Sequence, residues 1–183
     1  MARMERLEID ERLYLRPVGA ADAEPIYSLV EADRERLARW LPWAAAQTLA
    51  ATDQFIAESE AQAARGDGFQ AVLVRDGEIG GVAGYHRIDR ANRATSIGYW
   101  LAAAHQGEGV MSAAVKALVD HAFGAWGLHR VVIEAAVENR RSRAIPERLG
   151  FTEEGVLREA ELVGDRFLDG VLYSMLAPEW KSS

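Results

Sequence analysis

The sequence has no cysteine and no long hydrophobic run. Without cysteine, the chain cannot form disulfide bonds, thiolate metal sites or a cysteine nucleophile. No segment approaches the roughly 18 consecutive apolar residues that a membrane-spanning helix needs. The first six residues, MARMER, also lack the apolar core of a signal peptide. We therefore expect a cytoplasmic protein without a membrane partner.

Positive charge is also in short supply. Lysine and arginine number 21 against 28 aspartates and glutamates, which gives a formal net charge of −7. A negative surface field repels polyanions, so we expect no nucleic-acid partner. It leaves room for one basic pocket that holds a phosphorylated cofactor.

The rest of the composition is that of an ordinary folded protein. Hydrophobic residues make up 49% of the chain and charged residues 27%. A length of 183 residues suits one domain. The sequence contains no internal repeat, low-complexity tract or linker, so we expect a single domain over residues 1–183.

The order of apolar and polar residues predicts a mixed α/β fold. Apolar runs predict strands at residues 13–16, 69–75, 78–89, 95–101, 131–136, 151–158 and 166–175. Helical spacing and capping residues predict helices from Asp22, at 37–41, from Thr52-Asp53 to Gly66, at 110–125 and at 142–149. The segment 95–136 has the order strand–helix–strand, which makes a parallel crossover, whereas its surroundings look antiparallel. We expect a three-layer sandwich with one parallel switch point where a ligand can enter.

The turn Gln106-Gly107-Glu108-Gly109 stands between a strand and a helix. A helix N-terminus carries unpaired N–H groups and a partial positive charge, and glycines let the backbone approach an anion. Two common phosphate loops do not fit. Met111-Ser112 stands where the P-loop needs Lys-Ser/Thr, and Ser112 stands where the dinucleotide fingerprint needs its third glycine. The turn alone leaves a phosphate site and a purely steric helix start as equal alternatives.

Longer motifs around this turn resemble the GNAT superfamily of N-acetyltransferases. Its pyrophosphate signature, Gln/Arg-x-x-Gly-x-Gly/Ala, is matched at Gln106 and Gly109, and Met111 departs from it. That departure, with Gly98-Tyr99-Trp100-Leu101 before the turn, is similar to the RimJ/RimL-type ribosomal-protein N-terminal acetyltransferases, in particular their YdaF-like members. Further matches lie at residues 11–17 (ERLYLRP), 40–43 (WLPW), 139–151 (NRRSRAIPERLGF) and 154–158 (EGVLR). The resemblance covers nearly the whole chain.

The resemblance implies a fold and a cofactor. The fold would be a mostly antiparallel mixed α/β sheet whose central parallel pair splays at the cofactor, with helices on both faces. The cofactor would be acetyl-CoA, bound through the backbone at 106–111, the Ser112 hydroxyl and the strand end at 100–102, where the pantetheine arm would pair. Asn139 would bind a pantetheine amide, or it would cap the strand–helix turn. The implied cofactor-binding residues are Trp100, Leu101, Ala102, Gln106, Gly107, Glu108, Gly109, Val110, Met111, Ser112 and Asn139.

Two residues are implied to be catalytic. Ser142 would protonate the departing thiolate and Glu161 would be the base, although Ser142 is equally suited to be a helix N-cap and Glu161 to be a solvated surface residue. No His-Asp pair adjoins Ser142 in sequence, which favours direct attack in a ternary complex over an acyl-serine. The four histidines show no metal spacing, so we expect no metal. His86 lies on a strand beside the implied site and either lines it or packs at the surface.

The acceptor is the part that the sequence leaves open. A protein α-amine has a pKa near ~8, against ~10.4 for lysine, so an N-terminal acceptor is partly neutral in the cell and needs only a modest base. We expect N-terminal acetylation of a protein, with a small amine or a non-catalytic coenzyme-binding module as alternatives. Trp40, Trp43 and Trp100 belong either to the core or to an acceptor-side wall. We also expect a homodimer or larger oligomer.

Overall fold

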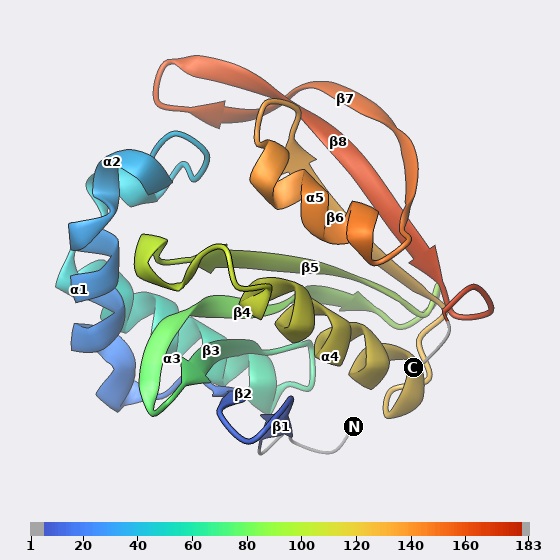
Figure 1. Ribbon diagram of the computed structural model, residues 1–183, viewed down its shortest axis with the longest axis horizontal. Coiled ribbons are helices and arrows are strands. Elements are labelled where there is room, and N and C mark those ends of the chain that lie inside the picture. Colours follow the sequence, from blue (N-terminus) through green and yellow to red (C-terminus); the bar gives the residue numbers. More distant parts are fainter. Residues whose placement is uncertain (1–5, 181–183) are drawn as a thin grey trace.

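The computed structural model describes residues 6–180, which form one eight-stranded sheet with helices on both faces (Figure 1). The strand order is β1-β2-β3-β4-β5-β6-β8-β7. The strands are β1 (Leu7–Glu8), β2 (Leu13–Pro17), β3 (Gln70–Arg75), β4 (Glu78–Asp89), β5 (Ala94–Leu101), β6 (Arg130–Ala136), β7 (Thr152–Val163) and β8 (Arg166–Leu176). The helices are α1 (Ala23–Ala32), α2 (Arg34–Leu37), α3 (Leu49–Ala64), α4 (Val110–Gly124) and α5 (Arg140–Arg148). The expected mixed α/β sheet is confirmed.

One strand pair in this sheet is parallel, and it is short. β5 and β6 pair in register at Ala94↔Arg130, Thr95↔Val131 and Ser96↔Val132. β5 then continues to Leu101 and β6 to Ala136, and the two ribbons diverge (Figure 1). The other strand pairs are antiparallel. The sheet therefore splays where sequence analysis places the cofactor arm.

Alternation along the strands divides the core between the two faces of the sheet. One face packs α4, through Val115, Leu118 and Val119, against side chains that include Ile97 and Ile133. The other face packs residues such as Val72 and Val82 beneath α1 and α3. Burying one such aliphatic side chain contributes about 1.5–3 kcal/mol, so both layers hold the splayed strands in place.

Local chemistry explains several element boundaries. Asp76 and Gly77 have φ angles of 52° and 85°, as the type I′ turn between β3 and β4 requires. Gly127, with φ of 60°, follows the end of α4. α3 begins earlier than the expected Thr52-Asp53, because Thr48 caps it by accepting a hydrogen bond from the N–H of Ala51 at 3.1 Å.

Three further expectations need correction. The second helix spans Arg34–Leu37 rather than 37–41. The final hairpin is longer than expected, because register shifts between Glu153 and Gly155 and between Leu157 and Glu161 obscure the alternation of β7. The last helix begins at Arg140 rather than at Ser142.

Candidate active site

The glycine turn opens α4 with its backbone exposed. Gly107 and Gly109 have φ angles of 89° and 74°, in the left-handed region that side chains disfavour. Gly109 is the N-cap of α4, and no side chain caps the helix there. A Cβ placed on either glycine would meet no atom within 4 Å, so both face open space. The first N–H groups of α4 are thus accessible to an anion.

The side chains that follow the turn anchor it in the core. Val110 and Met111 are buried, so they can offer a ligand only their backbone N–H groups. Met111, which departs from the family signature, is therefore a packing residue. The turn is thus anchored by buried side chains on its core side, while its two glycines face open space.

Basic side chains surround this open turn. Arg141 donates a hydrogen bond to Gln106 Oε1, and Arg148 donates one of 2.8 Å to the Ser112 hydroxyl. Because that hydroxyl accepts from Arg148, its own proton remains available to a ligand. Arg75 forms an ion pair with Glu108. Glu108 balances the charge of Arg75. Arg141 and Arg148, in contrast, bond here to neutral groups and give the turn the positive charge that suits a phosphorylated cofactor.

The splayed end of β5 offers both occupied and free polar groups. The Ala102 N–H donates to Gly80 at 2.8 Å, and the Leu101 carbonyl accepts from Arg36 at 2.8 Å. Leu101 and Ala102, which were predicted to pair with the coenzyme arm, thus already bond to Arg36 and Gly80 through these groups. The buried Arg36 Nε donor beside them has no hydrogen-bond partner among residues 6–180.

Together, the open turn, the arginines and the splayed strands fit acetyl-CoA. Its pyrophosphate suits the helix N-terminus, and its extended arm would pair with β5 beyond Ser96, where the pairing with β6 ends. Two arginines of α5, Arg141 and Arg148, extend the predicted set. Sequence reasoning missed them because they lie 35 and 36 residues from their partners along the chain.

Asn139 and Ser142 meet at the start of α5. Asn139 is the N-cap, because its Oδ1 accepts from the Ser142 N–H at 3.2 Å. Asn139, rather than Ser142, therefore caps α5, so capping does not occupy the Ser142 hydroxyl. Ser142 Oγ instead donates at 3.4 Å to the Tyr99 hydroxyl, which itself donates to the Ser142 carbonyl at 3.0 Å. Burial raises the pKa of Tyr99 to about 12, so this phenol stays protonated.

Glu161 lies on the opposite face of the sheet. It pairs with Leu168 on β8, while Glu134 of β6 pairs with Leu172, and both carboxylates point away from the face that carries α4. Glu161 is exposed at the surface, but desolvation by the surrounding protein, followed by the negative charge of Glu134, raises the pKa of its carboxyl group. The structure thus places Ser142 and Glu161 on the two sides of the splayed strands.

The aromatic residues near this second face are partly exposed. Trp43 packs edge-on against Trp100 with ring centroids 6.2 Å apart, and Trp43 keeps 38% of its surface exposed. His86 Nδ1 lies 3.1 Å from Ser96 Oγ. A Cβ on Gly98 would come within 2.4 Å of the His86 ring, so Gly98 makes space for it. His86 therefore covers β5 on the same face as Glu161.

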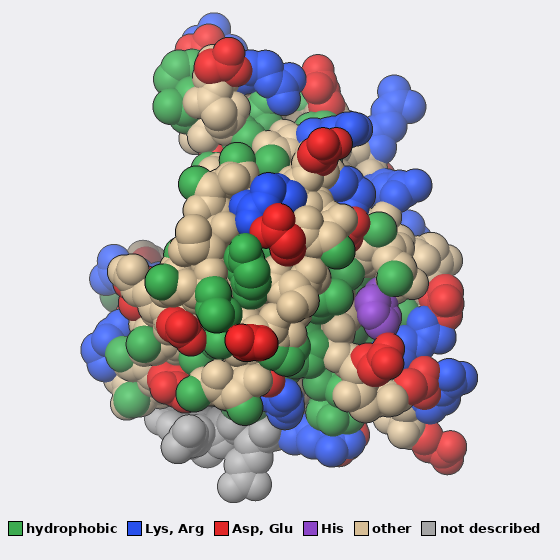
Figure 2. Space-filling view, turned by 90° about the vertical axis from the view of Figure 1, so that its left-hand side faces the viewer, with side chains coloured by type: hydrophobic (Ala, Val, Ile, Leu, Met, Phe, Trp, Pro, Cys, Tyr) green, Lys and Arg blue, Asp and Glu red, His purple; other side chains and the backbone are tan. Residues whose placement is uncertain are grey.

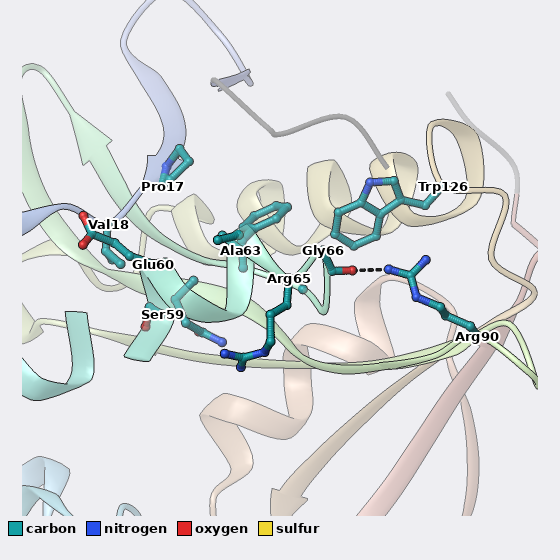
Figure 3. Close-up of a pocket in the computed structure, with 13 residues that line it drawn as sticks. Pro17, Val18, Ser59, Glu60, Ala63, Arg65, Gly66, Arg90 and Trp126 are labelled. Carbon is teal, nitrogen blue, oxygen red and sulfur yellow. Dashed lines mark hydrogen bonds between the residues drawn. The ribbon is translucent and has the colours of Figure 1, made fainter. Parts of the chain in front are cut away.

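Two pockets border α4 at its two ends. A pocket of about 420 Å³ adjoins the glycine turn between Arg12, Arg75 and Val110. Another of about 320 Å³ is lined by Arg65, Arg90 and Trp126, where Arg90 donates to the Gly66 carbonyl (Figure 3). α4 has 15 residues and is therefore roughly 22 Å long at 1.5 Å per residue, which separates this pocket from the turn.

Residues 6–180 contain neither a candidate metal site nor a candidate membrane-spanning helix. No group of three or more His, Asp or Glu side chains is placed to hold a metal ion within that part of the chain. No helix of the same part is long and apolar enough to cross a membrane.

The hairpin of β7 and β8 carries hydrophobic side chains on its surface. It projects as a lobe at the top of the molecule (Figure 2). Four residues in it are exposed by 42–60%: Val156, Leu157, Leu162 and Phe167. β7 is the outermost strand of the sheet, so this surface adjoins a sheet edge.

Comparison with known proteins agrees with this geometry. A model of the acetyltransferase (GNAT) domain matches residues 12–152. The chain is 38% identical to a putative ribosomal N-acetyltransferase, YdaF, of Bacillus subtilis over 176 residues, which are 95% of this chain and 96% of that protein. It is 31% identical to the ribosomal-protein-serine acetyltransferase of Escherichia coli K12, covering 94% and 97% of the two chains. A solved structure of RimL, a ribosomal L7/L12 alpha-N-protein acetyltransferase in complex with coenzyme A, superposes with a TM-score of 0.90 at 27% identity, covering 94% and 98%.

Proposed function

Because this chain belongs to the acetyltransferase (GNAT) family and is an acetyl-CoA-dependent N-acetyltransferase, we propose that its acceptor is the N-terminal α-amine of a protein. The observation that carries the proposal is the full-length similarity to relatives named for ribosomal proteins. A ribosomal protein is therefore the first acceptor to test.

The coenzyme would be held by the groups around the turn. The open N-terminus of α4, with Gly107 and Gly109, would take the pyrophosphate, and Arg141 and Arg148 would balance its charge. The arm would extend beside residues 97–101 of β5. Asn139 would donate from its Nδ2 group to an amide of the arm while its Oδ1 caps α5. Bound in this way, the coenzyme supplies an activated acetyl thioester.

The protein would provide a base and a hydrogen-bond donor from opposite faces. Glu161, through one water molecule, would accept the proton that the amine loses as it attacks the acetyl carbon. Its raised pKa supports this role, because the carboxylate is a stronger base than an ordinary glutamate. Ser142 would donate to the sulfur as the carbon–sulfur bond breaks. The partner of Ser142 is a tyrosine rather than a histidine, which favours direct attack over an acyl-serine.

The exposed hydrophobic hairpin supports a further proposal about assembly. Four large apolar side chains beside an open sheet edge resemble a surface that a second copy covers, so we propose a homodimer. We place the reaction in the cytoplasm, because ribosomal proteins and acetyl-CoA meet there.

A panel of acceptors with acetyl-CoA, read by mass spectrometry, tests the proposed function. The panel contains peptides with free N-terminal serine, alanine or methionine, the same peptides with blocked N-termini and one internal lysine, and spermidine. Acetylation of free N-termini alone supports the proposal. Faster turnover of spermidine, or modification of the blocked peptides, identifies a small-amine or lysine acetyltransferase instead.

A further inference from the structure

Tyr99 bridges two elements that the splayed sheet would otherwise separate. It is on β5, while its hydroxyl contacts Ser142 on α5, 43 residues further along the chain. Its ring lies on the face of the sheet that carries α4, packed at the edge of that core. The side chain thus reaches from the strand that borders the coenzyme arm to the proposed donor.

The two hydrogen bonds have a defined direction. Tyr99 has one hydroxyl proton, and it donates that proton to the Ser142 carbonyl at 3.0 Å. The Ser142 hydroxyl must then donate to Tyr99, at a longer distance of 3.4 Å. A contact of that length is weak, so the serine proton can turn to a better acceptor without a large cost.

We infer that Tyr99 is a positioning residue for acetyl transfer, which holds Ser142 at the start of α5 so that its hydroxyl faces the reacting sulfur. The inference rests on the proposed role of Ser142. The 3.0 Å bond from Tyr99 fixes the backbone of Ser142. The weaker 3.4 Å bond leaves the Ser142 hydroxyl able to turn and donate a hydrogen bond to the negative charge that develops on the sulfur. Because the phenol stays protonated at neutral pH, its bond to the serine carbonyl persists through the reaction.

A second tyrosine provides a matched control. Tyr173 of β8 also contacts α5 through its hydroxyl, which accepts from Arg143 and donates to Glu147, both at 2.8 Å. Removing this hydroxyl disturbs α5 without touching Ser142. Tyr173→Phe therefore measures what a hydroxyl contributes to seating the helix, and Tyr99→Phe measures that plus any effect on Ser142.

The experiment compares Tyr99→Phe, Tyr173→Phe, Ser142→Ala and the double variant Tyr99→Phe/Ser142→Ala. Steady-state rates are measured with acetyl-CoA and the fastest acceptor of the panel above, and thermal unfolding is recorded for each variant. We expect Tyr99→Phe to lower kcat at least about tenfold, which is about 1.4 kcal/mol of barrier, with little change in KM for acetyl-CoA. Tyr173→Phe should leave kcat within about twofold of the parent.

The double variant separates positioning from general stabilisation. If Tyr99 acts through Ser142, the double variant should be no slower than Ser142→Ala alone. Losses that multiply in the double variant, or equal losses of kcat in the two Tyr→Phe variants, overturn the inference. Full activity of Tyr99→Phe alongside a slow Ser142→Ala overturns it too, but leaves the role of Ser142 intact. A fully active Ser142→Ala variant overturns that role and the inference together.

Discussion

Replacing Gly109 by alanine distinguishes an anion site from a purely steric helix start. The φ angle of 74° makes alanine unfavourable by about 1–2 kcal/mol. For a chain of this length, each kcal/mol lowers Tm by about 2–4 °C, so we expect a fall of about 2–8 °C. The new Cβ meets no protein atom within 4 Å, so it faces open space at the N-terminus of α4, where we expect it to crowd a bound pyrophosphate.

That crowding should weaken coenzyme binding as well. Displacing the anion from one backbone N–H forfeits a charge-assisted hydrogen bond of about 1.5–3 kcal/mol. Calorimetric titration with coenzyme A should therefore show a Kd about tenfold to a hundredfold higher. Gly127→Ala is the matched control, because Gly127 also has a positive φ, 60°, but follows the other end of α4.

The two glycine variants should share the loss of stability and differ in Kd. Equal Kd values for Gly109→Ala, Gly127→Ala and the parent, despite lower Tm values, would refute the anion site. The turn would then be a steric device for starting the helix.

Two further predictions concern pH. Because its pKa is raised, Glu161 should become protonated, and kcat at saturating substrates should fall, at a pH above the ordinary glutamate value of 4.5. Glu134→Gln removes a negative charge beside Glu161, so it should shift this fall in kcat to lower pH. A fall that stays at the same pH would contradict the assignment of Glu161 as base. Arg130 and Ser174 hold the pKa of Glu154 at about 2, so the stability that this carboxylate contributes is fully present above its ordinary pKa of 4.5 and is lost progressively as pH falls from 4.5 through about 2. Glu154→Gln should therefore lower Tm at pH 7 and much less at about pH 2, and equal shifts in Tm at both pH values would show that the ion pair is not the cause.

Local signals in the sequence predicted the elements on which this site is built. Asp76-Gly77 has few conformations open to it other than the tight turn, and the glycines before Val110 mark a helix start without a side-chain cap. The strand–helix–strand order of 95–136 predicted the parallel pair, because such a connection needs a crossover.

The sequence could not choose between neighbouring residues of equal propensity. Asn139 and Ser142 are both good caps, three positions apart, and only the folded backbone brings Asn139 Oδ1 to the Ser142 N–H. Thr48 and Thr52 posed the same ambiguity at α3.

Contacts between distant segments were also beyond the sequence. The bonds from Tyr99 to Ser142 and from Arg148 to Ser112 depend on how α5 packs beside α4 and β5. No local periodicity encodes such pairs. The proposed coenzyme-binding residues that sequence analysis missed, Arg141 and Arg148, are of this kind.

The three residue pairs that join β5 to β6 also set the shape of what can react here. Past Ser96 and Val132 the parallel pairing ends, and the proposed coenzyme arm would take the position of a missing strand there. Neighbouring strands lie about 4.8 Å apart, so a coenzyme arm that pairs with β5 there would have to be extended, with amide groups that reach the strand backbone. The proposed pairing would thus select a donor by the shape of its arm before any side chain contacts the acyl group.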